Sequence, residues 1–95
     1  MDKSNQMIEE IRKQFFQVEK DHFYILNNYL TSQLKIQEVK EFGEKIAALR
    51  LLLDQIETTE ENLLEIAKYK SKIQHFYTEI MEDEELLGAA YNNNL

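Results

Sequence analysis

The chain has 95 residues and a mass of 11.4 kDa, which allows a single domain with one modest core. Its hydrophobic content of 43% is too high for a disordered chain, yet no apolar run is long enough to span a membrane. The net charge of −7, with only two arginines, argues against nucleic-acid binding, and the lack of cysteine excludes disulfides and thiolate metal sites.

The N-terminal residues "MDKSNQMIEEIRKQ" are acidic and lack the apolar stretch of a signal peptide, so we expect a cytoplasmic protein. Proline is absent, glycine occurs twice, and Leu, Ile, Glu, Lys and Gln dominate. This composition predicts an all-α chain.

The first predicted helix covers about residues 4–30, with Ser4 as its N-cap. Its apolar and aromatic residues alternate at spacings of three and four, which is the pattern of a helix with one buried stripe. The stripe comprises Ile8, Ile11, Phe15, Val18, His22, Ile25 and Tyr29.

The second predicted helix covers about residues 33–57. The same spacing continues on both sides of Gly43, which predicts an uninterrupted helix with close packing at the glycine. Its stripe comprises Val39, Phe42, Ile46, Leu49, Leu53 and Ile56.

The third predicted helix covers about residues 59–87. Thr58 and Glu61 have the spacing of a capping box, and Gly88 suits a helix C-terminus. The stripe of this helix comprises Ile66, Tyr69, Ile73, Phe76 and Ile80. We therefore predict one domain over residues 1–88 and a polar, flexible tail over 89–95. The acidic run 79–85 is expected to be a solvated helix end.

The boundary between the first two helices is the least marked, because "NNYLTSQLK" contains neither Gly nor Pro. Two architectures follow from it. The favoured one is an antiparallel three-helix bundle, and the alternative is a long helical hairpin, with the first two helices continuous, that dimerises to bury its apolar stripes.

The first helix carries more apolar side chains than its buried stripe can use. Phe16, Phe23, Leu26 and Leu30 lie one position further round the helix, and Tyr24 points elsewhere again. A third helix can cover Phe23 and Leu26, whereas Phe16 and Tyr24 are harder to bury. Because aromatic residues are enriched at interface hot spots, these five residues are the predicted partner-binding surface.

Histidine offers little evidence of catalysis. His22 lies on the buried stripe, where a histidine bonded to a neighbour is expected. His75 and Glu79 are four residues apart and could share a face, but no Glu-x-x-His motif of di-iron bundles is present. We therefore predict no catalytic residue, metal or cofactor.

Glu38, Glu41 and Glu44 repeat every three residues in "EVKEFGEKIAAL". This segment resembles the Glu-rich helix of MazG-type nucleoside triphosphate pyrophosphohydrolases, which are all-α enzymes. The resemblance implies a magnesium site completed by a later Glu-x-x-Asp, for which Glu57-x-x-Glu60 is the nearest substitute. Acids on a solvated helix face, paired with Lys40 and Lys45, are the competing explanation.

The segment "LRLLLDQIE" resembles the opening motif of helical chorismate mutases, although in that family the motif lies near the N-terminus. The other charges of that family's pocket are missing here. Arg50 and Asp54 are therefore expected to form an ion pair across one helical turn.

Two functions remain as hypotheses. The first is a small acidic, non-enzymatic module, such as an adaptor, chaperone, immunity protein or inhibitor, including a phage-encoded one, which binds a protein partner or itself. It would bind no nucleic acid, membrane or small-molecule substrate. The alternative is a magnesium-dependent pyrophosphohydrolase using Glu38, Glu41, Glu57 and Glu60.

Overall fold

The computed structural model describes residues 3–29, 31 and 34–92 of the chain, except the side chain of Ser4. Most of these residues lie in helices and none lies in a strand, as the sequence predicts. The three long helices are α1 (Lys3–Asn28), α2 (Ile36–Gln55) and α3 (Leu63–Phe76), followed by a π-helical turn η1 (Tyr77–Met81) and a short α4 (Glu84–Asn92). None of the described helices is long and apolar enough to cross a membrane.

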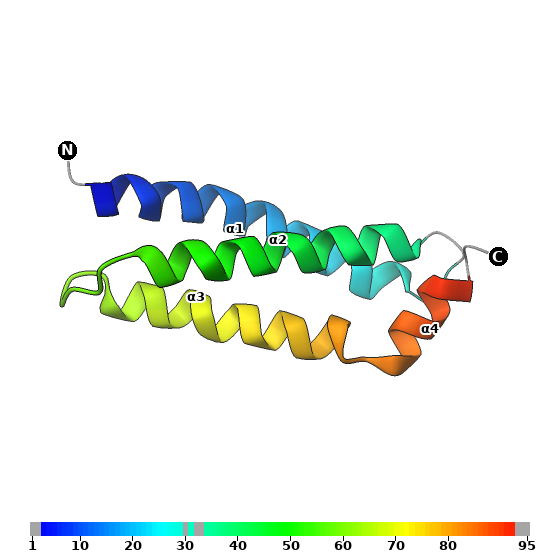
Figure 1. Ribbon diagram of the computed structural model, residues 1–95. Helices are drawn as coiled ribbons and strands as arrows, with labels where there is room; N and C mark the ends of the chain where they lie inside the picture. The colour runs from blue at the N-terminus through cyan, green and yellow to red at the C-terminus, as the bar shows by residue number, and fades with distance from the viewer. Residues whose placement is uncertain (1–2, 30, 32–33, 93–95) are drawn as a thin grey trace.

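The long helices form an up-down-up bundle in which α1 and α2 are separate and lie side by side (Figure 1). The alternative of one continuous first rod is therefore wrong. The end of α1 is set by side chains that compete for its backbone: the amides of Asn27 and Asn28 donate to the carbonyls of Phe23 and Tyr24 at 2.7 and 2.8 Å. The Thr31 hydroxyl then donates to the Asn28 carbonyl at 2.8 Å. At the other end α1 begins at Lys3, so Ser4 lies within the helix.

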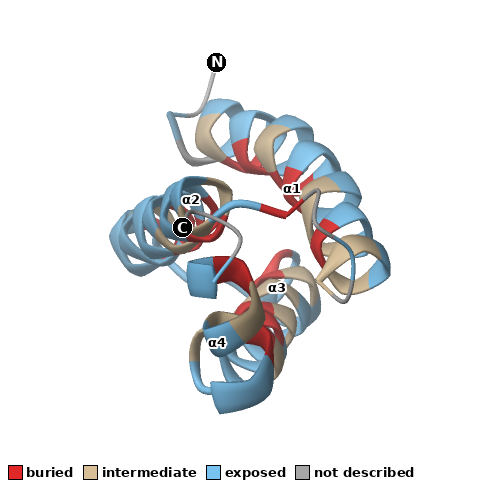
Figure 2. Ribbon diagram, turned by 90° about the vertical axis from the view of Figure 1, so that its right-hand side faces the viewer, coloured by how far each residue is buried: buried red, intermediate tan, exposed pale blue. Residues whose placement is uncertain are grey.

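The bundle interior consists of the three predicted stripes, seen as the red residues facing one another in Figure 2. Every aliphatic and phenylalanine member of the stripes is buried, whereas His22, Tyr29 and Tyr69 are half-buried at its edge. Spacings of three and four along each helix were sufficient to identify this core because they keep one face directed inward.

Ion pairs fix the register between α1 and α3, which run in the same direction. Arg12 binds Glu65 at 2.7 Å, and Glu19 binds Lys72 at 3.5 Å. Both members of the second pair lie seven residues beyond those of the first. Because seven residues are two helical turns, the two pairs join the same flanks of both helices. Between them the ring of Phe15 packs at a tilt against that of Tyr69, with 4.8 Å between ring centroids.

The connection from α2 to α3 contains a capping box, one residue later than predicted. The Thr59 hydroxyl accepts from the Asn62 backbone N–H at 3.3 Å, and the Asn62 side-chain oxygen accepts from the Thr59 N–H at 2.7 Å. The Asn62 amide also donates to the Glu57 carbonyl at 3.0 Å, and Asn62 is the one buried polar residue among those described. Thr58 and Glu61 are exposed, so the predicted pair was wrong. Both pairs fit the spacing, and burial of Asn62 selects the second.

The predicted third helix over 59–87 is not continuous. The helix widens at η1, where the Glu82 N–H bonds the Tyr77 carbonyl five residues earlier at 3.2 Å. Asp83 then begins α4: its carboxylate accepts from the Leu86 N–H at 3.0 Å. Two further acids, Glu84 and Glu85, occupy the first turn of α4, where negative charge complements the helix dipole. The acidic run is thus a helix start as well as a solvated surface.

The position of α4 also corrects the prediction for the C-terminus. Gly88 lies within α4 and does not end a helix, and residues 89–92 are helical. Of the predicted tail, only 93–95 lie outside the described residues.

The short α4 closes one end of the bundle by turning back against α2 and η1 (Figures 1 and 2). Leu86 and Ala90 of α4 are fully buried there, as are Leu34 in the α1–α2 connection and Ile80 of η1. The molecule is elongated, with extents of 49 × 20 × 18 Å. Its radius of gyration of 15.0 Å exceeds the value of about 12 Å expected for a compact domain of this length.

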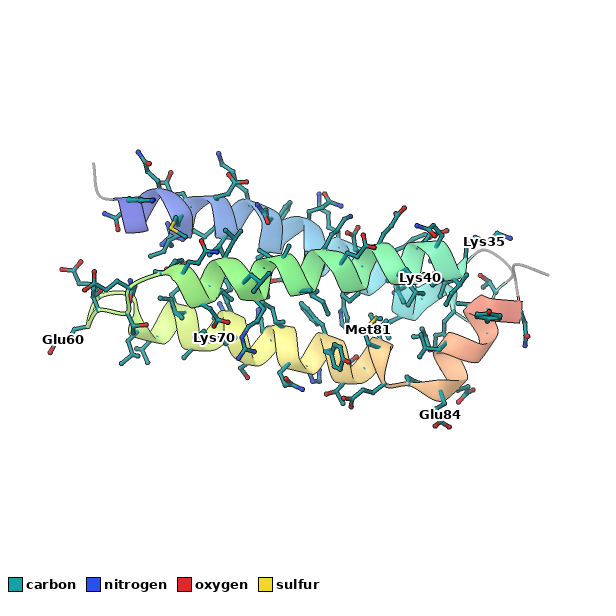
Figure 3. The ribbon with its side chains drawn as sticks, viewed as in Figure 1. Lys35, Lys40, Glu60, Lys70, Met81 and Glu84 are labelled. Carbon is teal, nitrogen blue, oxygen red and sulfur yellow. The ribbon has the colours of Figure 1, made fainter. Side chains whose placement is uncertain are left out.

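Gly43 is a point of close packing, as its place in the stripe pattern predicted. A β-carbon added there would lie 2.9 Å from the terminal methyl of Met81, which points toward α2 from η1 (Figure 3). The missing side chain therefore leaves room for Met81.

Candidate functional site

Phe16 and Phe23 are the most exposed aromatic side chains of α1, with 64% and 71% of their surface accessible. They lie seven residues apart, so they occupy the same face of the helix two turns apart. Between them Lys20 places its ammonium group 4.4 Å from the centre of the Phe16 ring. We call these three residues the α1 aromatic line. No helix of the bundle covers it, although the sequence pattern favoured burial of Phe23.

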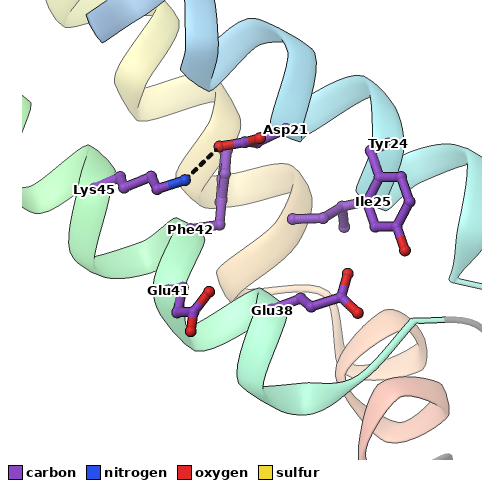
Figure 4. A pocket seen from close by; sticks show the side chains of 7 residues that line it. All are labelled: Asp21, Tyr24, Ile25, Glu38, Glu41, Phe42 and Lys45. Atoms are coloured by element: carbon purple, nitrogen blue, oxygen red, sulfur yellow. Dashed lines mark hydrogen bonds and ion pairs between the residues drawn. The ribbon is translucent and has the colours of Figure 1, made fainter.

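Tyr24 lies on a different side of α1. It lines a pocket of about 210 Å³ between α1 and α2, together with Asp21, Ile25 and four residues of α2 (Figure 4). Tyr24 is 42% exposed, and hydrogen bonding to the nearby Glu38 carboxylate raises the pKa of its hydroxyl. The predicted aromatic face is therefore two surfaces, and Tyr24 does not continue the α1 aromatic line.

The structure describes one of the two leucines of the predicted surface. Leu26 is half-buried and packs against the core. Leu30 lies outside the described residues. Among the described members of the predicted set, the exposed ones are Phe16, Phe23 and, to a smaller extent, Tyr24.

The structure divides the four glutamates proposed for a magnesium site. Glu38 and Glu41 line the α1–α2 pocket with Asp21, whose carboxylate binds Lys45 at 2.8 Å (Figure 4). Glu57 and Glu60 follow the other end of α2, and Figure 3 shows Glu60 at the opposite end of the bundle from Lys35. Since α2 has 20 residues, about 30 Å separate its ends, so one ion cannot contact both pairs. No group of three potential metal ligands is found among the described residues.

Glu79 joins the two histidines. His22 packs its ring against Phe76, with 4.3 Å between centroids, and its Nε2 lies 3.3 Å from Glu79. His75 contacts the other oxygen of the same carboxylate from one turn away. The prediction that His22 is a boundary histidine bonded to a neighbour is confirmed. His75 and Glu79 do share a face, where they form an ion pair when the histidine is protonated.

Glu65 has the most perturbed carboxylate of the α1–α3 interface. It accepts two hydrogen bonds from the Arg12 guanidinium at 2.7 and 2.8 Å and one from the Tyr69 hydroxyl at 2.7 Å. The hydrogen bonds from Arg12 are the main reason that the pKa of Glu65 falls to about 2. The pair raises the pKa of Arg12 in return. This group serves the register of the bundle and has no feature of a catalytic acid.

A second apolar surface was missed by sequence reasoning. A groove of about 270 Å³ lies between α2 and the segment formed by α3 and η1, and its lining includes Ile46, Ala47, Arg50, Ile73 and Tyr77. The signal was present in Gly43 and Ala47, which lie one turn apart on the same side of α2 and leave space that larger residues would fill.

Near this groove Arg50 lies 3.5 Å from Asp54, so the predicted ion pair is confirmed. Lys70 of α3 lies 3.4 Å from the same carboxylate oxygen. Arg50 and Asp54 thus belong to a charged link between α2 and α3, and their resemblance to the chorismate mutase motif needs no catalytic explanation.

Comparisons with known proteins identify no relative of this chain. No protein-family model matches the chain, and neither a curated protein nor a solved structure shows significant similarity to it.

Proposed function

We propose that this protein is a small, acidic, non-enzymatic interaction module that binds protein through the α1 aromatic line. The observation that carries the proposal is the exposure of two phenylalanines, at 64% and 71%, on one face of α1, away from the stripe that the bundle buries. Exposing large aromatic side chains is unfavourable by about 25 cal/mol per Å² of apolar surface. Aromatic residues that remain exposed and aligned are typical of an interface.

The surroundings of the line fit protein recognition. The ammonium group of Lys20 lies over the ring of Phe16, and the exposed residues Glu19 and Asn27 lie beside the line. Apolar anchors within a polar rim are the usual arrangement of a protein interface. Tyr24 and Leu26 are peripheral contacts in this proposal, and Leu30 lies outside the described residues.

The magnesium hydrolase is the less supported alternative. Glu38 and Glu41 line the same pocket and could act together, but Glu57 and Glu60 lie at the far end of the molecule. Its test is a magnesium titration and a panel of nucleoside triphosphates with Glu41→Gln as the control.

The interaction proposal is tested by site-specific photo-crosslinking in the native host. A benzoylphenylalanine replaces Phe16 or Phe23 in the full chain, and the matched control carries it at Leu64, which is 82% exposed at the start of α3. We expect discrete protein adducts from the two α1 positions and none of the same adducts from position 64. Adducts that are identical at all three positions, or absent at 16 and 23, contradict the proposal.

A further inference from the structure

The charges beside the α1 aromatic line identify a self-complementary surface. Glu19 lies on the side of the line that faces α3, where it binds Lys72 at 3.5 Å. Lys20 is the next residue, about 100° further round the helix, and therefore lies on the opposite side of the line. Between the two phenylalanines the helix thus carries one acid on one side of the line and one base on the other.

We propose that the partner of this surface is a second copy of the chain, in a parallel dimer of α1 helices, which assumes that the proposed interaction function is right. A two-fold axis parallel to α1 exchanges the two flanks, so Glu19 of each copy faces Lys20 of the other. Phe16 then packs against Phe16 of the second copy, and Phe23 against Phe23. The alignment makes apolar and charged contacts at the same time.

An antiparallel pairing of the two α1 helices does not bring opposite charges together. A two-fold axis perpendicular to the helices keeps each flank against itself, so Glu19 meets Glu19 and Lys20 meets Lys20. Like charges directly opposed are unfavourable, which selects the parallel arrangement. The parallel dimer also brings Lys13, which lies two turns before Lys20, opposite Arg12 of the second copy. The pairing of Arg12 with Glu65 balances the charge of that arginine.

The size of the surface predicts a weak dimer. A helix of 26 residues is about 39 Å long, so two α1 helices bury an area near the lower limit of specific interfaces, about 1,000 Å² in total. A dissociation constant on the order of 10–100 μM is expected.

The first experiment is sedimentation equilibrium of the full chain at low salt from about 5 μM to 1 mM, a range that brackets this affinity. We expect the mass to rise from monomer to dimer. The Phe16→Ser/Phe23→Ser variant should stay monomeric, whereas Leu51→Ser/Leu64→Ser, which removes two other exposed apolar residues, should still dimerise. A wild-type chain that stays monomeric up to the highest concentration overturns the dimer.

The second experiment tests the orientation by charge reversal. Glu19→Lys and Lys20→Glu each place like charges opposite one another in the parallel dimer and should weaken association at least about threefold. The double variant Glu19→Lys/Lys20→Glu restores opposite charges and should recover the wild-type dissociation constant. In an antiparallel dimer residue 19 meets residue 19 and residue 20 meets residue 20, so each single change leaves like charges opposed and the dissociation constant unchanged. A dissociation constant that neither single change affects therefore contradicts the proposal. Thermal unfolding followed by circular dichroism verifies that each variant is folded.

The two proposals fail separately. A monomeric wild-type chain that still gives discrete adducts from Phe16 removes the dimer and leaves a different protein as the partner. A dimer that persists in Phe16→Ser/Phe23→Ser removes the α1 aromatic line as the self-association surface.

Discussion

Glu65 shows how single side chains set the alignment of the bundle. Its carboxylate receives three hydrogen bonds, two from Arg12 of α1 and one from Tyr69 of its own helix. Arg12 is half-exposed, so solvent screens the pair and its contribution to stability is modest. The geometry nevertheless restricts α1 and α3 to one register, because a bidentate pair tolerates little sliding.

Glu65→Gln should lower the free energy of unfolding by about 1 kcal/mol at neutral pH. The pKa of Glu65 is lowered from 4.5 to about 2 in the folded chain. Its stabilising contribution is therefore complete above pH 4.5 and is lost as the pH falls toward 2. Urea unfolding at a series of pH values should show that the difference between wild type and variant shrinks over this range. A difference that is independent of pH contradicts the assignment, and Tyr69→Phe, which removes one hydrogen bond, serves as a milder control.

At the scale of an element, Asn62 determines where α3 begins. Its side chain connects the Thr59 N–H and the Glu57 carbonyl, and it is buried. Asn62→Ala leaves both backbone groups without this partner and should cost about 2 kcal/mol. Glu61→Ala, which changes the acid of the capping box expected from sequence alone, should have little effect. Denaturant unfolding measures the loss of stability in both variants from the shift of the midpoint, provided that the slope is unchanged. Equal losses in the two variants would argue against the Thr59–Asn62 box.

The start of α4 depends on Asp83 in the same way. Its carboxylate accepts from the Leu86 N–H, so Asp83→Ala should cost about 1 kcal/mol and increase amide exchange within α4. Glu82→Ala is the matched control, since Glu82 is exposed and lies just before the cap. Unchanged exchange rates in α4 of the Asp83 variant would show that packing alone holds this helix.

At the scale of the whole molecule, α4 closes the end of the core at which α1 ends and α2 begins. Leu86 is fully buried against this end, and Leu87 is only half-buried. Leu86→Ala should lower the free energy of unfolding by about 2–4 kcal/mol, and Leu87→Ala by clearly less, because the cost follows the buried volume removed. Equal losses in calorimetry or urea unfolding would contradict the docking of α4. The same measurement tests whether the bundle needs more than its three long helices.

The sequence by itself determined the helical class, the three buried stripes, the close packing at Gly43 and the ion pair between Arg50 and Asp54. These features depend on periodicity or on spacings within one helix, which any α-helix must obey. The aromatic residues were found in the same way, but only the tertiary structure separated Phe16 and Phe23 from Tyr24, because that depends on which flank of α1 each neighbouring helix covers.

The tertiary structure alone also decided how the C-terminal segment folds. A stripe pattern over 59–87 could not reveal η1 or the reversal into α4, since the apolar residues of both continue to fit a helical spacing. What selects the break is the end of the core beside α2 and η1, against which α4 packs with Leu86 and Ala90 buried. The separation of the glutamates proposed as magnesium ligands was also decided by the fold. Glu38 lies in the first turn of α2 and Glu57 follows its last residue, so a helix of about 30 Å keeps them apart.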